Sequence, residues 1–409
     1  MKLQTSCPRT LDDDELDRIC QAAVRIARRV PLRVSGRGRY VEELLSALRD
    51  FGCRIEDGER IVFTDEVIDR TMLAIARHKA AAPREFAPPP ARLSYSASGQ
   101  GLWCCDIEDD SIRPATTQDL ADLSRVVDAI PGLGRSHPTF LPQDVPIGLV
   151  SVHAFATIIL NSSVPYRVSV YNADLLPHFI ELDTIARGGD RAAVLRSPTF
   201  AAKAWLNTPF MLTGENIDIG MRARELMGCP LTISTMPLAG AATPVSLAGC
   251  LAQSAAEVIQ CNAISLALDN HLMGWTAGPL AIDPRTGAHT QSGPAVELLL
   301  LGARQVASHM FGGPVTSSGG PTTAAKVPGA QSMMEKSLQT SWAIMGGVRS
   351  FGSLATLAVA DVGSIVQLML DLEMMAHFQR LLEGIEVTPE TLAEEVIAQV
   401  APRGAYFLN

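Results

Sequence analysis

The chain has 409 residues, of which 47% are hydrophobic and 19% charged, a balance typical of a globular protein. Its length allows one large α/β barrel with a helical annex. The formal net charge is −9 and Lys and Arg are not clustered outside the segment Arg25–Arg39, which we assign to a solvated helix end. This excludes phosphate-backbone binding, so we expect no nucleic-acid partner.

Residues 1–90 form a predicted helical N-terminal region. Apolar residues recur at helical spacing in LDDDELDRICQAAVRIARRV, which has acids in its first turn and arginines in its last. A second helix, YVEELLSALRDFG, ends at a glycine suited to a C-cap, and a third, TDEVIDRTMLAIARHKA, begins at a threonine N-cap.

Residues 91–115 form a predicted β-hairpin after a proline-rich linker. Two short runs of alternating polarity, LSYSA and LWCCDI, are joined by SGQG. Glycine-containing connections of this length are common in hairpins, so we expect the two runs to pair with each other.

Residues 116–409 form a predicted (β/α)8 TIM barrel, which makes the chain an α/β protein. Strand candidates alternate with amphipathic helices in seven repeats, with strands at GRSHPTFL, YRVSVY, FAAKAWLNT, PLTISTM, LMGWTAGPLAI, GPVTSS and VRSFGSLA. This rhythm favours parallel strands linked by right-handed crossovers. A closed barrel is favoured over an open sheet because neither a GxGxxG motif nor a Walker loop follows the first strand. The eighth unit is weak; closure would use the tail IEVTPETLAEEVIAQVAPRGAYFL or the N-terminal region.

The predicted location is the cytoplasm, without membrane association. The eight cysteines form no CxxC motif and most lie in apolar segments, as expected of reduced thiols. The N-terminus MKLQTSCPRTLDDDELD lacks a signal-peptide core, and LLLLGARQVA is too short to span a bilayer. The sequence has no HxH, HExxH or cysteine cluster, so we expect no bound metal. The motif DNHLMG fits D-x-H-x-x-G, but it follows a helix, and we assign the match to chance.

Loops at the carboxyl ends of the barrel strands hold the candidate site, because chemistry in this fold occurs there. MPLAGAATP and TSSGGPTTAAK supply small residues, which would leave a wide, shallow opening for a large flat partner. Lys326 has three open interpretations: a Schiff-base lysine, part of a phosphate loop, or a solvated charge. Gln331 and Glu335 share a helix face, Glu297 stands in another helix's first turn, and His289 lies in a late loop.

The sequence resembles the trimethylamine methyltransferase family, in the branch that lacks pyrrolysine. The resemblance is carried by PLAGAATPVSLAGCLAQSAAEVIQCNAISL, SGGPTTAAKVPGAQSMMEK and DLEMMAHFQRLLEGIEVTPETLAEEVIAQVAPRG, with similarity in the N-terminal helices. It implies a single barrel that moves a methyl group from an N-methylated amine to the cobalt of a separate corrinoid protein. The pyrrolysine of the family would fall beside Ala325–Val327, where this chain has Lys326.

Members without pyrrolysine are implied to use quaternary amines such as glycine betaine, with no tightly bound cofactor of their own. The resemblance implies that Glu297, Lys326, Gln331 and Glu335 form the catalytic group and that a corrinoid-facing loop contains Gly240, Gly319, Gly320 and Thr322. Quaternary ammonium recognition uses aromatic faces, so the substrate-binding candidates are Tyr171, Trp205, Phe210 and Trp275, together with His289. We also expect a homo-oligomer.

The sequence departs from the family pattern at Gly329, where an aspartate is usual, at SGPAVE, and at the end GAYFLN, where relatives continue. Two alternatives therefore stay open. One is a quaternary-amine-binding protein that has lost methyl transfer, and the other is a Schiff-base lyase that uses Lys326.

Overall fold

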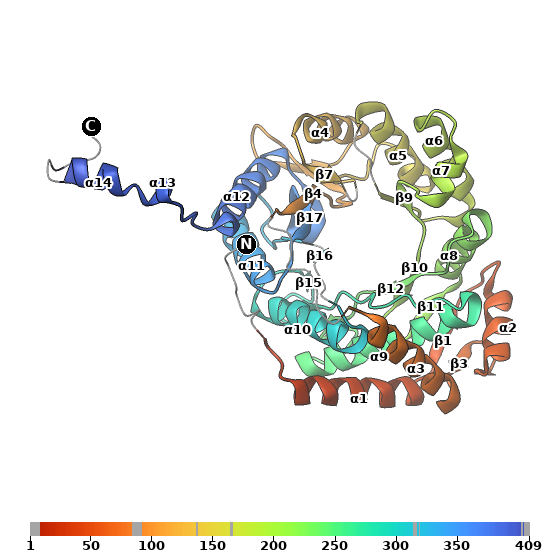
Figure 1. Ribbon diagram of the computed structural model, residues 1–409. Coiled ribbons are helices and arrows are strands. Elements are labelled where there is room, and N and C mark those ends of the chain that lie inside the picture. Colours follow the sequence, from red (N-terminus) through yellow and green to blue (C-terminus); the bar gives the residue numbers. More distant parts are fainter. Residues whose placement is uncertain are drawn as a thin grey trace.

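The computed structural model describes residues 9–83, 92–135, 138–163, 167–313, 317–318, 320–401 and 404. It is a mixed α/β protein in which helices surround short strands (Figure 1). The helices are α1 (Asp13–Arg29), α2 (Val41–Phe51), α3 (Asp65–Ala81), α4 (Thr117–Ala129), α5 (Val150–Asn161), α6 (Leu176–Ala186), α7 (Arg191–Arg196), α8 (Gly214–Met227), α9 (Leu247–Asp269), α10 (Pro294–Phe311), α11 (Ala330–Met345), α12 (Ile365–Glu383), α13 (Pro389–Leu392) and α14 (Glu394–Val400).

The strands are short and lie in several sheets. They are β1 (Leu32–Ser35), β2 (Arg54–Glu56), β3 (Arg60–Val62), β4 (Ser94–Ala97), β5 (Trp103–Cys105), β6 (Ile112–Pro114), β7 (Gly134–Arg135), β8 (Val168–Ser169), β9 (Phe200–Ala201), β10 (Ala204–Asn207), β11 (Met211–Thr213), β12 (Ile233–Thr235), β13 (Leu238–Ala239), β14 (Leu280–Ile282), β15 (His289–Thr290), β16 (Ser317–Ser318), β17 (Ser350–Leu354), β18 (Thr356–Leu357) and β19 (Val362–Gly363).

Parallel strand pairs follow one another around the molecule in sequence order. The pairs are β4–β7, β8–β9, β10–β12, β13–β14, β16–β17 and β17–β4. The last pair brings the final repeat back to the first strand. Within the described residues β7 does not pair with β8, nor β14 with β16, so these strands do not join into one closed sheet. The α/β class is confirmed, whereas a closed barrel is not established by this hydrogen bonding.

The strand of the seventh repeat, β17, pairs with β4, which precedes the repeats in the sequence. The C-terminal tail therefore does not supply this partner. The pairing predicted between LSYSA and LWCCDI is therefore wrong, because both edges of β4 are taken by parallel neighbours. The hairpin of this region is β5–β6 instead. The two glycines of SGQG allow other backbone segments to pack closely against this loop. A Cβ on Gly99 would lie 2.8 Å from the Thr139 carbonyl oxygen, and a Cβ on Gly101 would lie 2.7 Å from the Asp361 carbonyl oxygen.

The three N-terminal helices are confirmed as α1, α2 and α3. Asp12 forms a capping box with Glu15, Thr64 caps α3, and Gly52 closes α2 in the left-handed conformation. Three strands between them were not expected from the sequence. β1 pairs in parallel with β11, and β11 pairs antiparallel with β10. The N-terminal region is thereby joined to β10, a strand of the repeats. The annex thus shares a sheet with the repeats, and its division into a separate unit stays a prediction.

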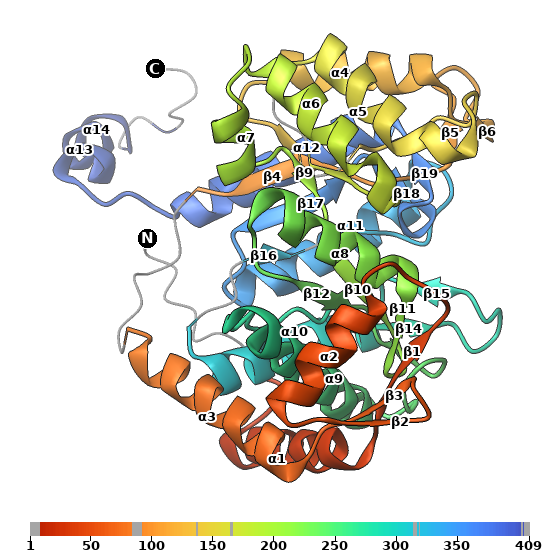
Figure 2. The ribbon, with the colours of Figure 1, turned by 90° about the vertical axis from the view of Figure 1, so that its right-hand side faces the viewer.

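Helix α9 is enclosed on all sides. Every residue from Cys250 to Ser265 except Gln253 is buried, because the N-terminal helices α1 and α3 cover the face turned away from the strands (Figure 2). Gln260 on α9 donates to the carbonyls of Ala27 (3.1 Å) and Val30 (2.7 Å) at the end of α1. A helix covered on all sides needs mostly apolar residues all round, which accounts for the scarcity of charged residues in α9, where only Glu257 and Asp269 are charged. No helix in the described part of the chain is long and apolar enough to cross a membrane.

A buried ion pair fastens α11 to α12. Lys336 Nζ lies 2.7 Å from Asp371 Oδ2, and both side chains are fully buried. Asp371 also accepts hydrogen bonds from Gln367 Nε2 and from the Ala355 backbone N–H, each at 2.8 Å. Burial lowers the pKa of Lys336 and raises that of Asp371, whereas their mutual attraction opposes both shifts.

We predict that Lys336→Met lowers the free energy of unfolding by about 3–5 kcal/mol, because it leaves the Asp371 carboxylate buried without a counter-charge. Chemical denaturation followed by circular dichroism measures this. The double variant Lys336→Met/Asp371→Leu serves as the control and should recover most of the loss. Equal midpoints for the wild type and the single variant would contradict the prediction.

Candidate functional site

The loop after β16 is held by one carboxylate. Glu335 Oε2 accepts hydrogen bonds from Thr323 Oγ1 (2.6 Å), the Ala324 N–H (2.8 Å) and Ser292 Oγ (3.1 Å). Its Oε1 accepts from Gln331 Nε2 at 2.9 Å. Burial alone would raise the pKa of Glu335, but these hydrogen bonds outweigh it and hold the pKa below its usual value. The carboxylate therefore organises the loop.

A second side chain of α11 fixes the start of the same loop. Gln339 Oε1 accepts from the Thr322 N–H at 2.6 Å, and Gln339 Nε2 donates to the Gln291 carbonyl at 2.7 Å. Thr322 Oγ1 donates to that carbonyl as well, also at 2.7 Å. Gly320 fits tightly against this loop, because a Cβ there would lie 3.0 Å from the Thr322 backbone nitrogen. The loops after β15 and β16 are thus joined through α11.

A strained segment supports the loop from the other side. Ala358, Val359 and Ala360 all have positive φ, at 46°, 62° and 74°. In this conformation the N–H groups of Ala358 and Val359 donate to the carbonyls of Ala325 and Thr323, each at 2.7 Å. Left-handed backbone in β-branched Val359 is costly and is found where surrounding structure enforces it, often at functional sites.

Glu297 lies beneath this loop network in the first turn of α10. Its side chain is buried, and burial raises its pKa to about 7, although a hydrogen bond with Gln339 and the charge of Arg304 oppose the shift. Burial likewise lowers the pKa of Arg304 to about 10. The predicted catalytic residues Glu297, Gln331 and Glu335 are therefore brought together around α11, and their catalytic roles stay a prediction.

A pocket at strands β8–β10 contains two of the predicted aromatic residues. Tyr171 and Trp205 line it and are 50% and 41% exposed, so both side chains are accessible from the pocket. The pocket measures about 100 Å³, and its wall includes Lys203 and, from α8, Glu215 and Asn216. Lys203 Nζ lies 4.6 Å from the centre of the Trp205 ring. Burial and the charge of Arg167 lower the pKa of Lys203.

The other predicted substrate-binding residues lie elsewhere. Phe210 is buried in the hydrophobic core, and Trp275 packs against that core while its Nε1 donates to the Ala277 carbonyl at 2.8 Å. Both rings are therefore accounted for by packing in the core, and the Trp275 N–H by its hydrogen bond. His289 is exposed and pairs with Ile282 at the strand edge of β15. These three residues do not line the pocket of Tyr171 and Trp205.

The predicted rim residues are small and lie on neighbouring loops. Gly240 is exposed with φ 88°, and a Cβ there would lie 3.1 Å from Ile282 on β14, which pairs with β15. Gly320 and Thr322 follow on the next loop, but both are buried, so they do not form its outer surface. Lys326 is exposed at the end of that loop, as the solvated-charge interpretation requires. Gly319 lies outside the described residues.

Glu257 on α9 was missed by sequence reasoning. It is fully buried and accepts from Thr235 Oγ1 (2.6 Å), Thr208 Oγ1 (3.0 Å) and the Phe210 N–H (3.3 Å). Burial raises its pKa, and these hydrogen bonds oppose the shift. It joins α9 to the ends of β10 and β12. A glutamate in the middle of a helix whose only other charged residue is the terminal Asp269 was the available signal.

Two further features are structural. Asp269 of DNHLMG accepts from Arg224 Nε and from the Leu231 N–H (2.8 Å), so it fastens the end of α9.

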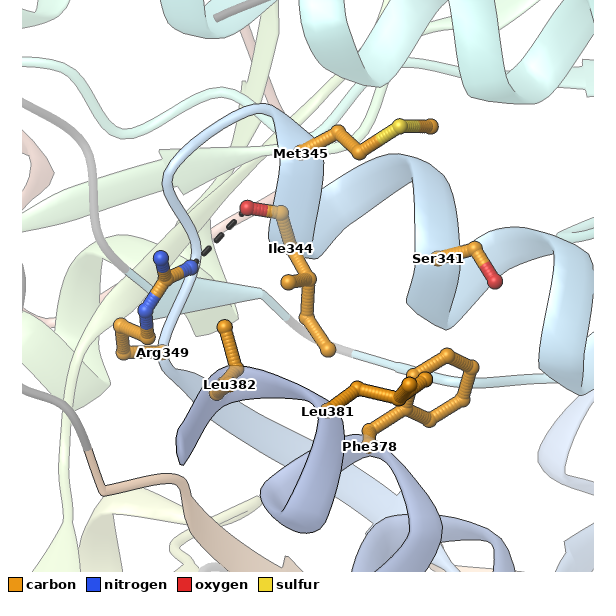
Figure 3. A pocket seen from close by; sticks show the side chains of 7 residues that line it. All are labelled: Ser341, Ile344, Met345, Arg349, Phe378, Leu381 and Leu382. Atoms are coloured by element: carbon orange, nitrogen blue, oxygen red, sulfur yellow. Dashed lines mark hydrogen bonds between the residues drawn. The ribbon is translucent and has the colours of Figure 1, made fainter. Parts of the chain in front are cut away.

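An apolar pocket of about 220 Å³ lies between the C-terminal ends of α11 and α12, at the far end of α11 from Glu335 (Figure 3). Its one charged group, Arg349, donates to the Ile344 carbonyl. The described residues contain no His, Cys, Asp or Glu cluster that could hold a metal ion.

Comparison with known proteins identifies the class. The sequence profile of the trimethylamine methyltransferase (MTTB) family matches residues 3–409. The protein is therefore a methyltransferase. It belongs to the trimethylamine methyltransferase family, which confirms the resemblance seen in its glycine-rich loops.

Named relatives are distant but cover most of the chain. The trimethylamine methyltransferase MttB of Methanosarcina thermophila is 23% identical over 95% of this chain and 81% of its own length. The glycine betaine methyltransferase of Desulfitobacterium hafniense is 24% identical over 98% of this chain and 82% of its own length. Among solved structures, the hydrogenase maturase HydG matches with a TM-score of 0.38 at 12% identity, covering 84% of this chain and 68% of its own.

We predict that Glu297→Gln changes the pH dependence of stability. Because the folded-state pKa is raised to about 7, the wild type carries a cost that grows as pH rises from about 4.5 to 7 and is absent at lower pH. The variant lacks this cost. At pH 8 it should be more stable than the wild type by on the order of 3 kcal/mol, and the difference should shrink toward zero near pH 4.5. Urea unfolding at several pH values measures this, and a difference independent of pH would refute it.

Proposed function

We propose that the protein transfers a methyl group from a quaternary amine to the Co(I) of a separate corrinoid protein. The observation that supports this most is the pocket lined by the partly exposed aromatic side chains of Tyr171 and Trp205, in which the Trp205 ring already holds a cation, the Lys203 ammonium. Aromatic faces attract quaternary ammonium groups through the ring quadrupole. A relative in the same family is named as a glycine betaine methyltransferase, and glycine betaine is a quaternary amine.

We further propose that the parallel strands form the inner ring of a (β/α)8 barrel. The cyclic order of the pairs, which returns from β17 to β4, supports this, as does the ring of helices in Figure 1. In such a ring the loops after β13, β14, β16 and β17 would share one mouth with the aromatic pocket.

The residues of this rim fit the approach of a flat tetrapyrrole. Gly240, Ala241 and Ala324 are exposed and carry at most one methyl group each, so the partner would meet backbone and small side chains. The Co(I) corrinoid of the partner protein supplies the nucleophile that accepts the methyl group. Gly240 and Ala324 would face it, the buried Gly320 and Thr322 would support the loop from below, and the Glu335 hydrogen bonds would keep that loop in place.

The chemistry requires orientation rather than acid catalysis from this chain. The departing tertiary amine takes no proton, so Tyr171 and Trp205 need only hold the cation and aim one N-methyl group at the rim. Exclusion of water by the pocket wall would strengthen the cation–π contact.

Anaerobic mixing with a Co(I) corrinoid protein and quaternary amines tests this proposal. We expect the methyl–Co(III) absorption spectrum to form with at least one betaine. Trp205→Ala should lower kcat/KM about 10- to 30-fold, because a desolvated cation–π contact is worth about 2 kcal/mol. Leu73→Ala, which removes an exposed side chain on α3, is the matched control. Betaine binding without spectral change would favour the alternative of a binding protein without methyl transfer.

We also propose a homo-oligomer in the cytoplasm. The free thiols of the described cysteines support a reducing compartment. Helices α13 and α14 form an arm that extends away from the body (Figures 1 and 2). The arm exposes Ile385, Val387, Leu392, Val396 and Ile397, each by about half or more, and a second copy of the chain would cover them.

We predict that Val396→Asp/Ile397→Asp lowers the molar mass measured by size-exclusion chromatography with light scattering, because charges would face the partner copy. Glu395→Gln, on the same helix and exposed, is the control and should keep the mass of the wild type. A wild type that is monomeric at micromolar concentration would exclude this interface.

A further inference from the structure

The wall of the aromatic pocket is built by two neighbouring strands. Val168 and Val170 are buried, as are Ala204 and Leu206, so the alternating residues Ser169, Tyr171, Lys203 and Trp205 take the opposite face. Ser169 pairs with Ala201 in parallel register. Tyr171 and Lys203 each follow this pair by two residues, Trp205 follows on β10, and all three line the same pocket.

The pocket holds two opposite charges that do not neutralise each other. Lys203 has no acidic partner among the described residues, and its contact is with the Trp205 ring. Glu215 lines the same pocket from the first turn of α8, and it also forms no ion pair in the described structure. A partly buried ammonium without a counter-ion costs free energy, and burial and Arg167 already lower the pKa of Lys203. An anionic ligand group would remove this cost.

We propose that this pocket takes a quaternary ammonium that carries a carboxylate, with the carboxylate bound by Lys203 Nζ. The ammonium then lies against Tyr171 and Trp205 on the Glu215 side, with its methyl groups towards the mouth. The pocket thus matches both charges of a betaine-type zwitterion. A methylamine cation without a carboxylate leaves Lys203 unneutralised and meets its repulsion, so Lys203 is a specificity-determining residue. This inference rests on the proposed function, whose methyl donor it specifies.

Calorimetric titration of the full chain tests the proposal without a corrinoid partner. The probes are glycine betaine and tetramethylammonium, which share a quaternary nitrogen and differ in the carboxylate. We expect Lys203→Met to weaken the binding of glycine betaine about 10- to 100-fold, which is the range for loss of a hydrogen bond between charged groups. The affinity for tetramethylammonium should stay equal or increase. Lys203→Arg should retain most of the betaine affinity. Lys79→Met, an exposed lysine at the end of α3, should bind both probes as the wild type does.

Each outcome separates the two proposals. Equal effects of Lys203→Met on both probes, or no effect on either, overturn the role of Lys203 and leave the proposed function standing. If the wild type binds tetramethylammonium but not glycine betaine, the proposal that the pocket prefers a zwitterion is overturned, and the proposed function again stands. Failure of the wild type to bind either probe overturns the quaternary-amine function itself. Circular dichroism of Lys203→Met, compared with Lys203→Arg, excludes loss of folding as the cause.

Discussion

The rim of the candidate site depends on one carboxylate. The loop after β16 consists mainly of glycine, threonine, alanine and proline and has little apolar surface with which to pack. Glu335 compensates by accepting hydrogen bonds from Thr323, Ala324 and Ser292, so one helix side chain holds residues of two loops. The loop can therefore stay small and open without losing its shape. Any flat partner that approaches would meet an ordered surface.

The pocket and the rim have different physical tasks. The pocket contains aromatic side chains and two charged ones, Lys203 and Glu215, which in the proposed function would select the small molecule. The rim contains small side chains and backbone, which would allow a large partner to approach. The proposed methyl transfer would need both properties, because the substrate must be held while one methyl group remains accessible. The strained backbone at Val359 lies behind the rim loop and stabilises it.

The N-terminal annex contributes to the repeats as well as covering them. Helix α1 covers α9, and Gln260 ties the two together, so α9 can be apolar on every face. Buried in that helix, Glu257 joins it to the ends of β10 and β12, next to the strand that carries Trp205. Loss of the annex would expose α9 and loosen these strand ends.

The sequence by itself determined the β/α rhythm, the N-terminal helices, the loops with small residues and the family, because periodicity, caps and glycines are local signals. Only the tertiary structure decided that β4 pairs with β17, that Phe210 and Trp275 belong to the core, and that Glu335 gathers the rim. It also placed Lys203 beside Trp205, with no acidic partner in the part of the chain that the structure describes. Such facts depend on which distant residues share a space and on whether water reaches them. Neither strand partners nor burial can be read from neighbours along the chain.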